Sequence, residues 1–308
     1  MGFSLTDVVS INDFSGEDID FVLKQAEKVE AMPASKKHSL LSGKAVALLF
    51  FEPSTRTRLS FERAAYDLGA KVTGFSDASA SSTAKGESLS DSIKTIENYA
   101  DMIVIRHPRD GSARRAAEVS KKPVINGGDG SNQHPTQTLL DLYTIKKEFG
   151  KIDGLNIGII GDLRHGRTVH SLAMALRHFE GIQLFLVSPE FLRMPKEIVE
   201  EINNSIKISQ SESLWQFLPE LDVLYATRVQ KERFSDTLEY EKAKNAFTLG
   251  REILEKTKPD FRIMHPLPRV NELKTELDET KAALYFQQAA NGIPVREALL
   301  NILKRGEK

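Results

Sequence analysis

The sequence predicts an α/β fold with two doubly wound domains, each a parallel sheet flanked by helices. Three observations predict this. Short apolar runs, typical of buried strands, alternate along the chain with longer segments of helical spacing. Turns rich in Gly, Ser, Thr and Arg follow several of these runs, at the sheet edge where such folds bind ligands. The 308 residues are enough for two domains of ordinary size.

Individual elements follow from local patterns. Ser15 and Asp18 form the pattern of a capping box, which predicts a first helix at about Gly16 to Glu30. Strands are predicted at 44–51, 71–75, 101–105, 123–126, 155–160, 182–187, 206–208, 222–226 and 262–265. Further helices are predicted at 57–68, 87–99, 112–120, 134–149, 167–179, 195–203, 249–257 and 294–304.

Two of these elements define the domain organisation. The long helix that begins at His134 ends at Gly150, and a new strand starts near Leu155, so the second sheet begins there. The last helix, after Asn291, is expected to return to the first domain. The chain shows no repeat and no low-complexity linker.

Composition excludes several classes of protein. Forty-two basic and 43 acidic residues give a net charge of −1, so no global field attracts nucleic acid. No apolar run is long enough to span a membrane, and the N-terminus does not resemble a signal peptide. The absence of cysteine excludes disulfides, thiol catalysis and thiolate metal sites. A cytoplasmic enzyme is therefore expected.

The segment Phe51–Arg58 is the most informative, because it joins a predicted buried strand to a predicted helix. Backbone N–H groups and the positive end of the helix dipole favour an anion at a helix N-terminus. The guanidinium of Arg56 can hold phosphate through two hydrogen bonds. A plain helix cap would explain one hydroxyl, but not two arginines around a second threonine. The turn is therefore predicted to bind phosphate.

Two further segments of the first domain carry candidate site residues. Arg106 directly follows the strand 101–105, which places it at the same sheet edge as the phosphate turn. His134 stands at the start of a helix, near Gln137. The helix dipole disfavours protonation of the imidazole there, so a neutral His134 can donate a hydrogen bond to a carbonyl oxygen. A structural capping role for His134 stays open as an alternative.

The second domain offers a different set of polar turns. Its first turn lacks the glycine spacing and the acidic residue of a dinucleotide site, which excludes a nicotinamide cofactor. Arg167, at the start of the following helix, is instead predicted to bind a carboxylate. Arg228 and Gln230 follow another strand of this domain. In the segment His265–Arg269, two prolines remove N–H donors and leave carbonyl acceptors, which suit an ammonium or amide group.

Together these segments resemble the catalytic chains of the aspartate carbamoyltransferase family. The resemblance runs from about residue 5 to residue 304. Its motifs are Phe51–Arg58, Lys85–Glu87, Arg106–Pro108, His134–Gln137, Gly166–Thr168, Thr227–Gln230 and His265–Arg269. Ornithine carbamoyltransferases typically have cysteine where this chain has Thr136 and Pro266. One departure is Ala84, where some family members have a second lysine.

The resemblance implies transfer of the carbamoyl group from carbamoyl phosphate to the amino group of L-aspartate, an early step of pyrimidine biosynthesis. It implies a carbamoyl phosphate domain at 1–135 with 291–308 and an aspartate domain at 136–290. It also implies a homotrimer, in which the serine-rich loop with Ser81 and Lys85 reaches the neighbouring active site. No metal or organic cofactor is expected.

The resemblance also implies residue roles. Catalytic roles fall to Arg56, Thr57, Arg106 and His134. Carbamoyl phosphate is bound by Ser54, Thr55, Arg56, Thr57, Arg106, His134, Gln137, Pro266 and Leu267, with Ser81 and Lys85 from the adjacent subunit. Aspartate is bound by Lys85, Arg167, Arg228 and Gln230.

Three alternatives remain at this point. The first is carbamoyl transfer to another amine such as ornithine, against which two carboxylate-binding arginines argue. The second is a non-catalytic scaffold homologue, which should have lost parts of the site, whereas every motif is present. The third is a protein that binds carbamoyl phosphate without turnover. The sequence leaves open whether separate regulatory chains attach, whether aspartate binding is cooperative, and which nucleotides act as effectors.

Overall fold

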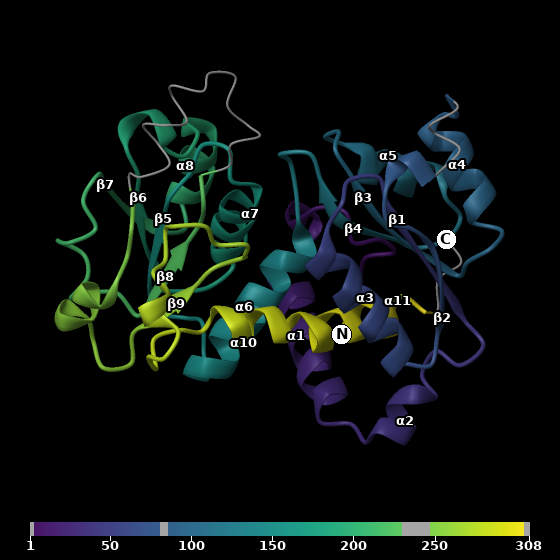
Figure 1. Cartoon of the computed structure of the whole chain (residues 1–308), viewed down its shortest axis with the longest axis horizontal. Coiled ribbons are helices and arrows are strands. Elements are labelled where there is room, and N and C mark those ends of the chain that lie inside the picture. Colours follow the sequence, from purple (N-terminus) through teal and green to yellow (C-terminus); the bar gives the residue numbers. More distant parts are fainter. Residues whose placement is uncertain (1–2, 81–85, 230–246, 305–308) are drawn as a thin grey trace. The chain divides into compact units, whose positions relative to one another are not determined.

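The computed structural model describes residues 3–80, 86–229 and 247–304. These residues form two compact units. Unit 1 comprises Met1–Tyr143 with Asn291–Lys308, and unit 2 comprises Thr144–Ala290. Each unit contains one sheet in which all strands run parallel (Figure 1).

The sheet of unit 1 has four strands in the order β2-β1-β3-β4. Their bounds are Ala45–Phe50 (β1), Lys71–Phe75 (β2), Met102–His107 (β3) and Val124–Asp129 (β4). The chain moves outward from β1 to β2 and then returns to the other side of β1 for β3 and β4. Since parallel crossovers are right-handed, these two directions place the connecting helices on opposite faces of the sheet.

Six helices and two short 3₁₀ helices surround this sheet. They are α1 (Gly16–Glu30), α2 (Ala34–His38), α3 (Thr55–Asp67), α4 (Leu89–Ile96), α5 (Ser112–Val119), α11 (Gly292–Leu303), η1 (Ile11–Asp13) and η2 (Ala78–Ala80). Helix α11 packs against α1 and α3, while α4 and α5 pack together. The return of the last helix to the first part of the chain is thus confirmed.

The hydrophobic core of unit 1 follows from the alternation of side chains along its strands. Ala47 and Leu49 of β1 join Ile103 and Ile105 of β3 in one apolar cluster, which also includes Ala113 of α5. Alternate residues of a strand point to opposite faces, so both faces of this sheet must be apolar to be covered by helices. This is why the strand segments read as continuous apolar runs in the sequence.

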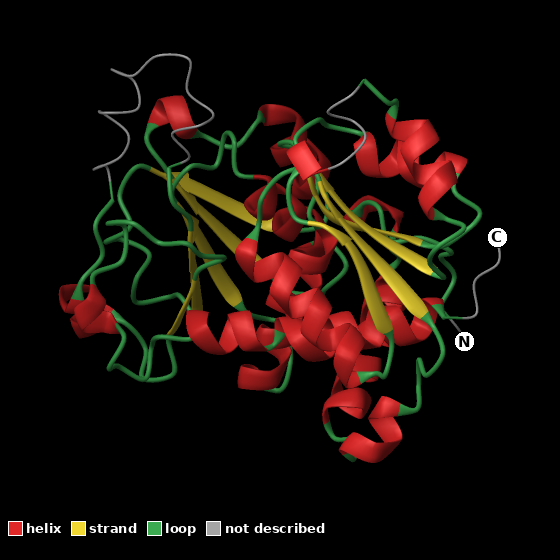
Figure 2. Cartoon of the chain, turned by 45° about the vertical axis from the view of Figure 1, so that its right-hand side comes forward, coloured by secondary structure: helices red, strands yellow, loops and turns green. Residues whose placement is uncertain are grey.

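Unit 2 has five parallel strands in the order β7-β6-β5-β8-β9, shown among the yellow arrows in Figure 2. They are β5 (Asn156–Ile160), β6 (Gln183–Val187), β7 (Lys207–Ser211), β8 (Val223–Ala226) and β9 (Arg262–Met264). The helices of the described part of this unit are α7 (Arg167–Leu176), α8 (Lys196–Asn203), α10 (Tyr285–Ala290), η4 (Glu190–Leu192), η6 (Arg251–Lys256) and η7 (Thr275–Leu277). Helix α6 (Pro135–Phe149) begins in unit 1 and ends in unit 2.

The predicted fold class is confirmed, and all nine predicted strands are present to within a few residues. The α-helix predicted at 249–257 is wrong, because the segment is the 3₁₀ helix η6. Gly250 is extended before it, and Pro259 soon after it cannot continue a helix, so the segment stays a short 3₁₀ helix. The short helices α2 and α10 were not predicted. No helix in the described part of the chain is long and apolar enough to cross a membrane.

Candidate active site

The predicted phosphate turn of unit 1 lies at the point where the strand order reverses. Strands β1 and β3 are neighbours, although the chain visits β2 between them. The backbone N–H of Phe51 donates to the carbonyl of Arg106 at 2.8 Å, so the ends of β1 and β3 are joined directly. In open parallel sheets, ligands bind beyond the carboxyl ends of the strands at such a reversal. The topology therefore brings the turn 51–57 and Arg106 to the expected place.

The turn itself differs from an ordinary helix cap. Ser54 occupies the N-cap position of α3, but its side chain makes no capping hydrogen bond within the described residues. Thr57 is buried, whereas Thr55 and Arg56 are exposed. The first N–H groups of an α-helix have no partner one turn earlier. The capping interpretation is thus wrong for the Ser54 hydroxyl, and the helix start presents hydroxyl and N–H donors together.

Arg106 is anchored from two sides. Its Nη1 donates to the carbonyl of Gly127 at 3.0 Å, and its Nη2 lies 2.8 Å from Oε2 of Glu52. A methyl group on Gly127 would lie 3.6 Å from Cγ2 of Thr57 and 3.7 Å from Cβ of Arg106. Strand β4, the phosphate turn and Arg106 therefore converge at Gly127. The fixed guanidinium needs little further ordering to bind an anion.

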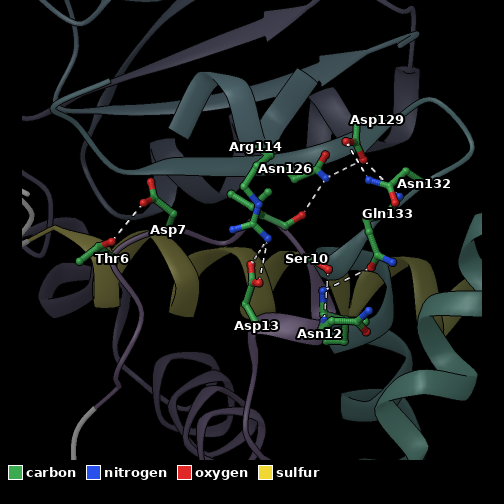
Figure 3. A network of polar contacts seen from close by, with 12 residues as sticks. Thr6, Asp7, Ser10, Asn12, Asp13, Arg114, Asn126, Asp129, Asn132 and Gln133 are labelled. Carbon is green, nitrogen blue, oxygen red and sulfur yellow. Dashed lines mark hydrogen bonds and ion pairs between the residues drawn. The ribbon is translucent and has the colours of Figure 1, made fainter. Parts of the chain in front are cut away.

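The loop between β4 and α6 is held by buried polar contacts (Figure 3). The carboxylate of Asp129 accepts hydrogen bonds from the backbone N–H of Gly111 at 3.0 Å and of Gln133 at 3.1 Å. It also accepts one from the amide of Asn126 at 2.9 Å. Gly130 takes a positive φ of 52° in this loop, as the glycine pattern predicts. Asp129 was not predicted from the sequence, although a carboxylate between glycines was an available signal.

This loop leads directly to the predicted residues of helix α6. His134 is buried beside the start of α6, and its carbonyl accepts from the backbone N–H of Gln137 at 3.0 Å. The Gln137 side chain is nearly buried, and its Nε2 donates to Oδ1 of Asp141 at 2.8 Å. Strand β4 neighbours β3, so His134 follows the strand next to the one that carries Arg106. Asp141 was not identified from the sequence.

Unit 2 has its own reversal of strand order, between β5 and β8. Arg167 is the first residue of α7, the helix after β5, and Arg228 lies two residues after the end of β8. The N–H of Thr227 donates to the carbonyl of Ile160 at 2.9 Å, which joins the two strand ends. Gly161 permits this approach, since a Cβ there would lie 2.1 Å from the carbonyl oxygen of Thr227. The two predicted carboxylate ligands thus lie at the same edge of this sheet.

The loop after β9 is organised by a buried histidine. Nδ1 of His265 accepts from the backbone N–H of Leu267 at 2.8 Å, so its proton is on Nε2, which donates to Oε1 of Glu272 at 2.7 Å. Leu267 has an unusual φ of 55°. The backbone N–H groups of Val270 and Asn271 also donate to Glu272, each at 3.1 Å. These contacts fix the course of the segment that carries Pro266 and Leu267.

Burial and hydrogen bonding shift the pKa values of His265 and Glu272 in opposite directions. Burial lowers the pKa of His265, although the hydrogen bond with Glu272 favours its protonated form. The positive charges of Arg269 and Arg228 lower it further. Burial by itself would raise the pKa of Glu272, but the bonds from His265 and the backbone lower it on balance. Glu272 was another residue that the sequence analysis did not identify.

Three predicted residues lie outside the described part of the chain. They are Ser81, Lys85 and Gln230. The structure therefore places Ser54, Thr55, Arg56, Thr57, Arg106, His134 and Gln137 at or after the carboxyl ends of β1, β3 and β4 in unit 1. In unit 2, Arg167, Arg228, Pro266 and Leu267 follow the carboxyl ends of β5, β8 and β9.

These features define a class: a two-unit α/β protein with polar and cationic turns at the strand-order reversal of both sheets. Comparison with known families identifies the member of this class more closely. Residues 6–147 match the family model of the aspartate/ornithine carbamoyltransferase carbamoyl-P binding domain, and residues 153–303 match that of the Asp/Orn binding domain. This chain belongs to the aspartate/ornithine carbamoyltransferase family.

Individual relatives are similar over nearly the whole chain. The aspartate carbamoyltransferase catalytic subunit of Thermococcus kodakarensis is 59% identical over 299 residues, 96% of each chain. That of Methanosarcina barkeri is 53% identical, with 97% of each chain covered. The predicted resemblance to the aspartate carbamoyltransferase family is confirmed.

Solved structures agree with these sequence relatives. The catalytic subunit of M. jannaschii aspartate transcarbamoylase is 51% identical with a TM-score of 0.90, covering 97% of this chain and 98% of that chain. Aspartate transcarbamoylase from Trypanosoma cruzi in complex with carbamoyl phosphate and aspartate is 37% identical with a TM-score of 0.89, covering 96% of each chain.

Proposed function

We propose that this chain is an enzyme that transfers the carbamoyl group of carbamoyl phosphate to the amino group of L-aspartate, giving N-carbamoyl-L-aspartate and phosphate. The observation that carries the proposal is that arginine-bearing turns stand at the strand-order reversal of both sheets. One substrate is a phosphate and the other a dicarboxylate, and each reversal presents groups for one of them. Relatives named aspartate carbamoyltransferase, at 50–59% identity, support this reaction.

Unit 1 supplies the groups for carbamoyl phosphate. Ser54, Thr55, Arg56 and Thr57 hold the phosphate at the start of α3, together with Arg106. Backbone N–H groups and guanidiniums at one point stabilise a dianion more strongly than either kind of donor alone. Arg106 is already oriented by Glu52 and Gly127 before any ligand binds.

The same region polarises the carbonyl group that is attacked. Thr57, Arg106 and His134 donate to the carbamoyl oxygen and stabilise the oxyanion of the tetrahedral intermediate. Gln137 holds the carbamoyl NH₂ group, assisted by the carbonyls of Pro266 and Leu267. The amine loses a proton as the C–N bond forms, and the departing phosphate accepts it, so no side chain needs to act as general base.

Unit 2 supplies the groups for aspartate. Arg167 and Arg228 bind its two carboxylates, with help from Gln230. The planar guanidinium matches a carboxylate through two parallel hydrogen bonds. Ornithine has a cationic side chain in place of the second carboxylate, so two arginines disfavour it as the acceptor.

We also propose the domain bounds, the assembly and the cellular location of this chain. Residues 1–135 with 291–308 form the carbamoyl phosphate domain, and residues 136–290 form the aspartate domain. The chain forms a homotrimer in the cytoplasm, where Ser81 and Lys85 of one subunit complete the site of the next. It acts in pyrimidine biosynthesis, and the catalytic-subunit names of its relatives are consistent with added regulatory chains. A solution mass of three times 34.4 kDa would support the trimer, and a monomer would contradict it.

Phosphate release from carbamoyl phosphate tests the reaction directly. The native chain should release phosphate with aspartate at least about 100-fold faster than with ornithine, because a site built for a charged group rejects a substrate that lacks it. Arg56→Ala should lower kcat/KM by about 10²–10³, the usual loss for one preorganised donor.

Arg63→Ala is the matched control. Arg63 lies on the same helix, is exposed, and pairs with Asp67 at 2.7 Å, so its removal should leave the rate within about twofold. Equal rates with aspartate and ornithine would contradict the proposed acceptor. Equal rates for the native chain and Arg56→Ala would contradict the proposed phosphate site.

A further inference from the structure

Two buried charged residues lie near Gln137 of the proposed site, one on the same helix and one on α11. Asp141 of α6 is 0% exposed and Arg296 of α11 is 3% exposed. Burial lowers the pKa of Arg296 to about 10, and the negative charge of Asp141 opposes this shift. Apolar residues of similar volume would stabilise a core as well or better. Stability by itself therefore does not account for charges at these two positions.

Asp141 touches a residue of the proposed site. Its Oδ1 accepts the hydrogen bond from Nε2 of Gln137 at 2.8 Å, one helical turn earlier on α6. An ionised carboxylate can only accept hydrogen bonds, whereas a side-chain amide has one donor end and one acceptor end. Gln137 must therefore turn its NH₂ group toward Asp141. Its Oε1 is then the end that remains to receive a donor.

The side chain of Arg296 packs closely against residues of the surrounding helices. Its guanidinium lies over the ring of Phe61, 5.0 Å from the centroid. A Cβ on Gly292 would lie 2.1 Å from its Nη1, so any larger residue there would displace the guanidinium. Phe61 lies one turn after Thr57 on α3, the helix that begins at the phosphate turn. The cation is thus held beside both helices that carry the proposed carbamoyl phosphate ligands, α3 and α6.

We propose that Asp141 and Arg296 are positioning residues that orient the amide of Gln137 and thereby select acyl phosphates with an NH₂ group on the acyl carbon. This inference rests on the proposed function, in which Gln137 holds the carbamoyl NH₂. Oε1 of Gln137 accepts from the NH₂ of carbamoyl phosphate but gains nothing from the methyl group of acetyl phosphate. Arg296 balances the charge of Asp141, so the carboxylate stays an acceptor in the dry interior.

The variant Asp141→Asn separates orientation from packing. Asparagine has nearly the same shape, but its amide can donate as well as accept. Gln137 is then free to turn over and to present its own NH₂ to the substrate, so that donor faces donor. The dissociation constant of carbamoyl phosphate should rise about tenfold or more, while those of acetyl phosphate and inorganic phosphate should change less than about threefold.

Helix α11 provides a rescue and a matched control. Arg296→Met should lose the preference for carbamoyl over acetyl phosphate, and Arg296→Lys should restore part of it because the charge returns. Glu297, the next residue, is 0% exposed and pairs with Lys37 at 2.9 Å. Glu297→Gln also breaks a buried pair and should lower the melting temperature, but it should keep the preference.

Calorimetric titration of the full-length chain with the three ligands gives these constants without turnover. A tenfold or larger loss of preference in Asp141→Asn supports the inference, even if the native chain transfers no carbamoyl group to aspartate. An unchanged preference overturns it, even if the native chain is active. Equal weakening of all three ligands also overturns it, since that result indicates general damage to the unit.

Discussion

The phosphate turn of unit 1 and the loop 265–272 of unit 2 follow buried parallel strands, but they are held in different ways. The phosphate turn leads into the first turn of α3, and the side chain of the N-cap residue Ser54 makes no capping hydrogen bond in the described structure. The loop 265–272 lies outside regular structure, and its shape depends on the buried pair of His265 and Glu272. Helix geometry positions the first, and side-chain hydrogen bonds position the second.

The two segments therefore differ in how strongly their side chains contribute to the stability of the fold. A helix start presents its N–H groups whatever its exposed side chains are, so residues of the phosphate turn are available for ligand binding at little cost to the fold. An irregular buried loop needs partners for each of its polar groups. Side chains that shape such a loop are therefore also part of the stability of the unit. Three pairs of substitutions test this comparison.

The largest effect is expected for Glu272→Gln. The carboxylate accepts from His265 at 2.7 Å and from two backbone N–H groups, and breaking a buried pair usually costs several kcal/mol. We expect a loss of about 3 kcal/mol in the free energy of unfolding, measured by urea denaturation. Glu279→Gln, at the exposed partner of Arg251, should cost less than about 0.5 kcal/mol. A loss that small for Glu272→Gln would show that the pair does not hold the loop.

The same pair predicts how stability depends on pH. Because burial lowers the pKa of His265, the unfolded chain takes up a proton first as the pH falls below 6.5, which destabilises the fold. The pKa of Glu272 lies below 4.5, so its contribution is present above pH 4.5 and is lost as the pH falls further. The difference in melting temperature between the native chain and E272Q should therefore narrow below pH 4.5. A constant difference would contradict this account.

An intermediate effect is expected at the two sheet reversals. Gly161 has a φ of 126°, and a Cβ there would overlap the carbonyl oxygen of Thr227 at 2.1 Å. Gly161→Ala should cost about 2 kcal/mol, since both strain and overlap must be relieved, and should raise KM for aspartate by moving Arg228. At Gly127 the nearest atom would lie 3.4 Å away, so Gly127→Ala should cost less than about 1 kcal/mol. Equal losses in urea denaturation would contradict the comparison.

The smallest effect is expected from two serines at helix starts. Ser15 caps α1 through a full capping box, with its Oγ accepting from the N–H of Asp18 at 3.1 Å. Ser15→Ala should cost about 1 kcal/mol and leave kinetics unchanged. Ser54→Ala should cost only a few tenths of a kcal/mol, because no cap is lost, but should raise KM for carbamoyl phosphate about tenfold. The reverse pattern would assign Ser54 to the fold and not to the ligand.

The local chemistry of the sequence predicted most of the fold. Apolar runs mark the strands because a parallel sheet covered on both faces must be apolar throughout, as Ala45–Phe50 illustrates. The capping box at Ser15 marks the start of α1, because both of its hydrogen bonds join residues three apart. The turn at residues 53–57 likewise has the composition of an anion site within one short segment.

Tertiary structure alone decided which side chains support these turns. Asp141, Glu272 and Arg296 have no local signal strong enough to reveal their roles. Glu272 meets His265 only because the loop after β9 folds back on itself, and Arg296 lies over Phe61 of α3 only because α11 returns to unit 1. A buried charge is acceptable only where the fold brings its partner. That partner is set by packing and strand order, which local sequence patterns do not encode.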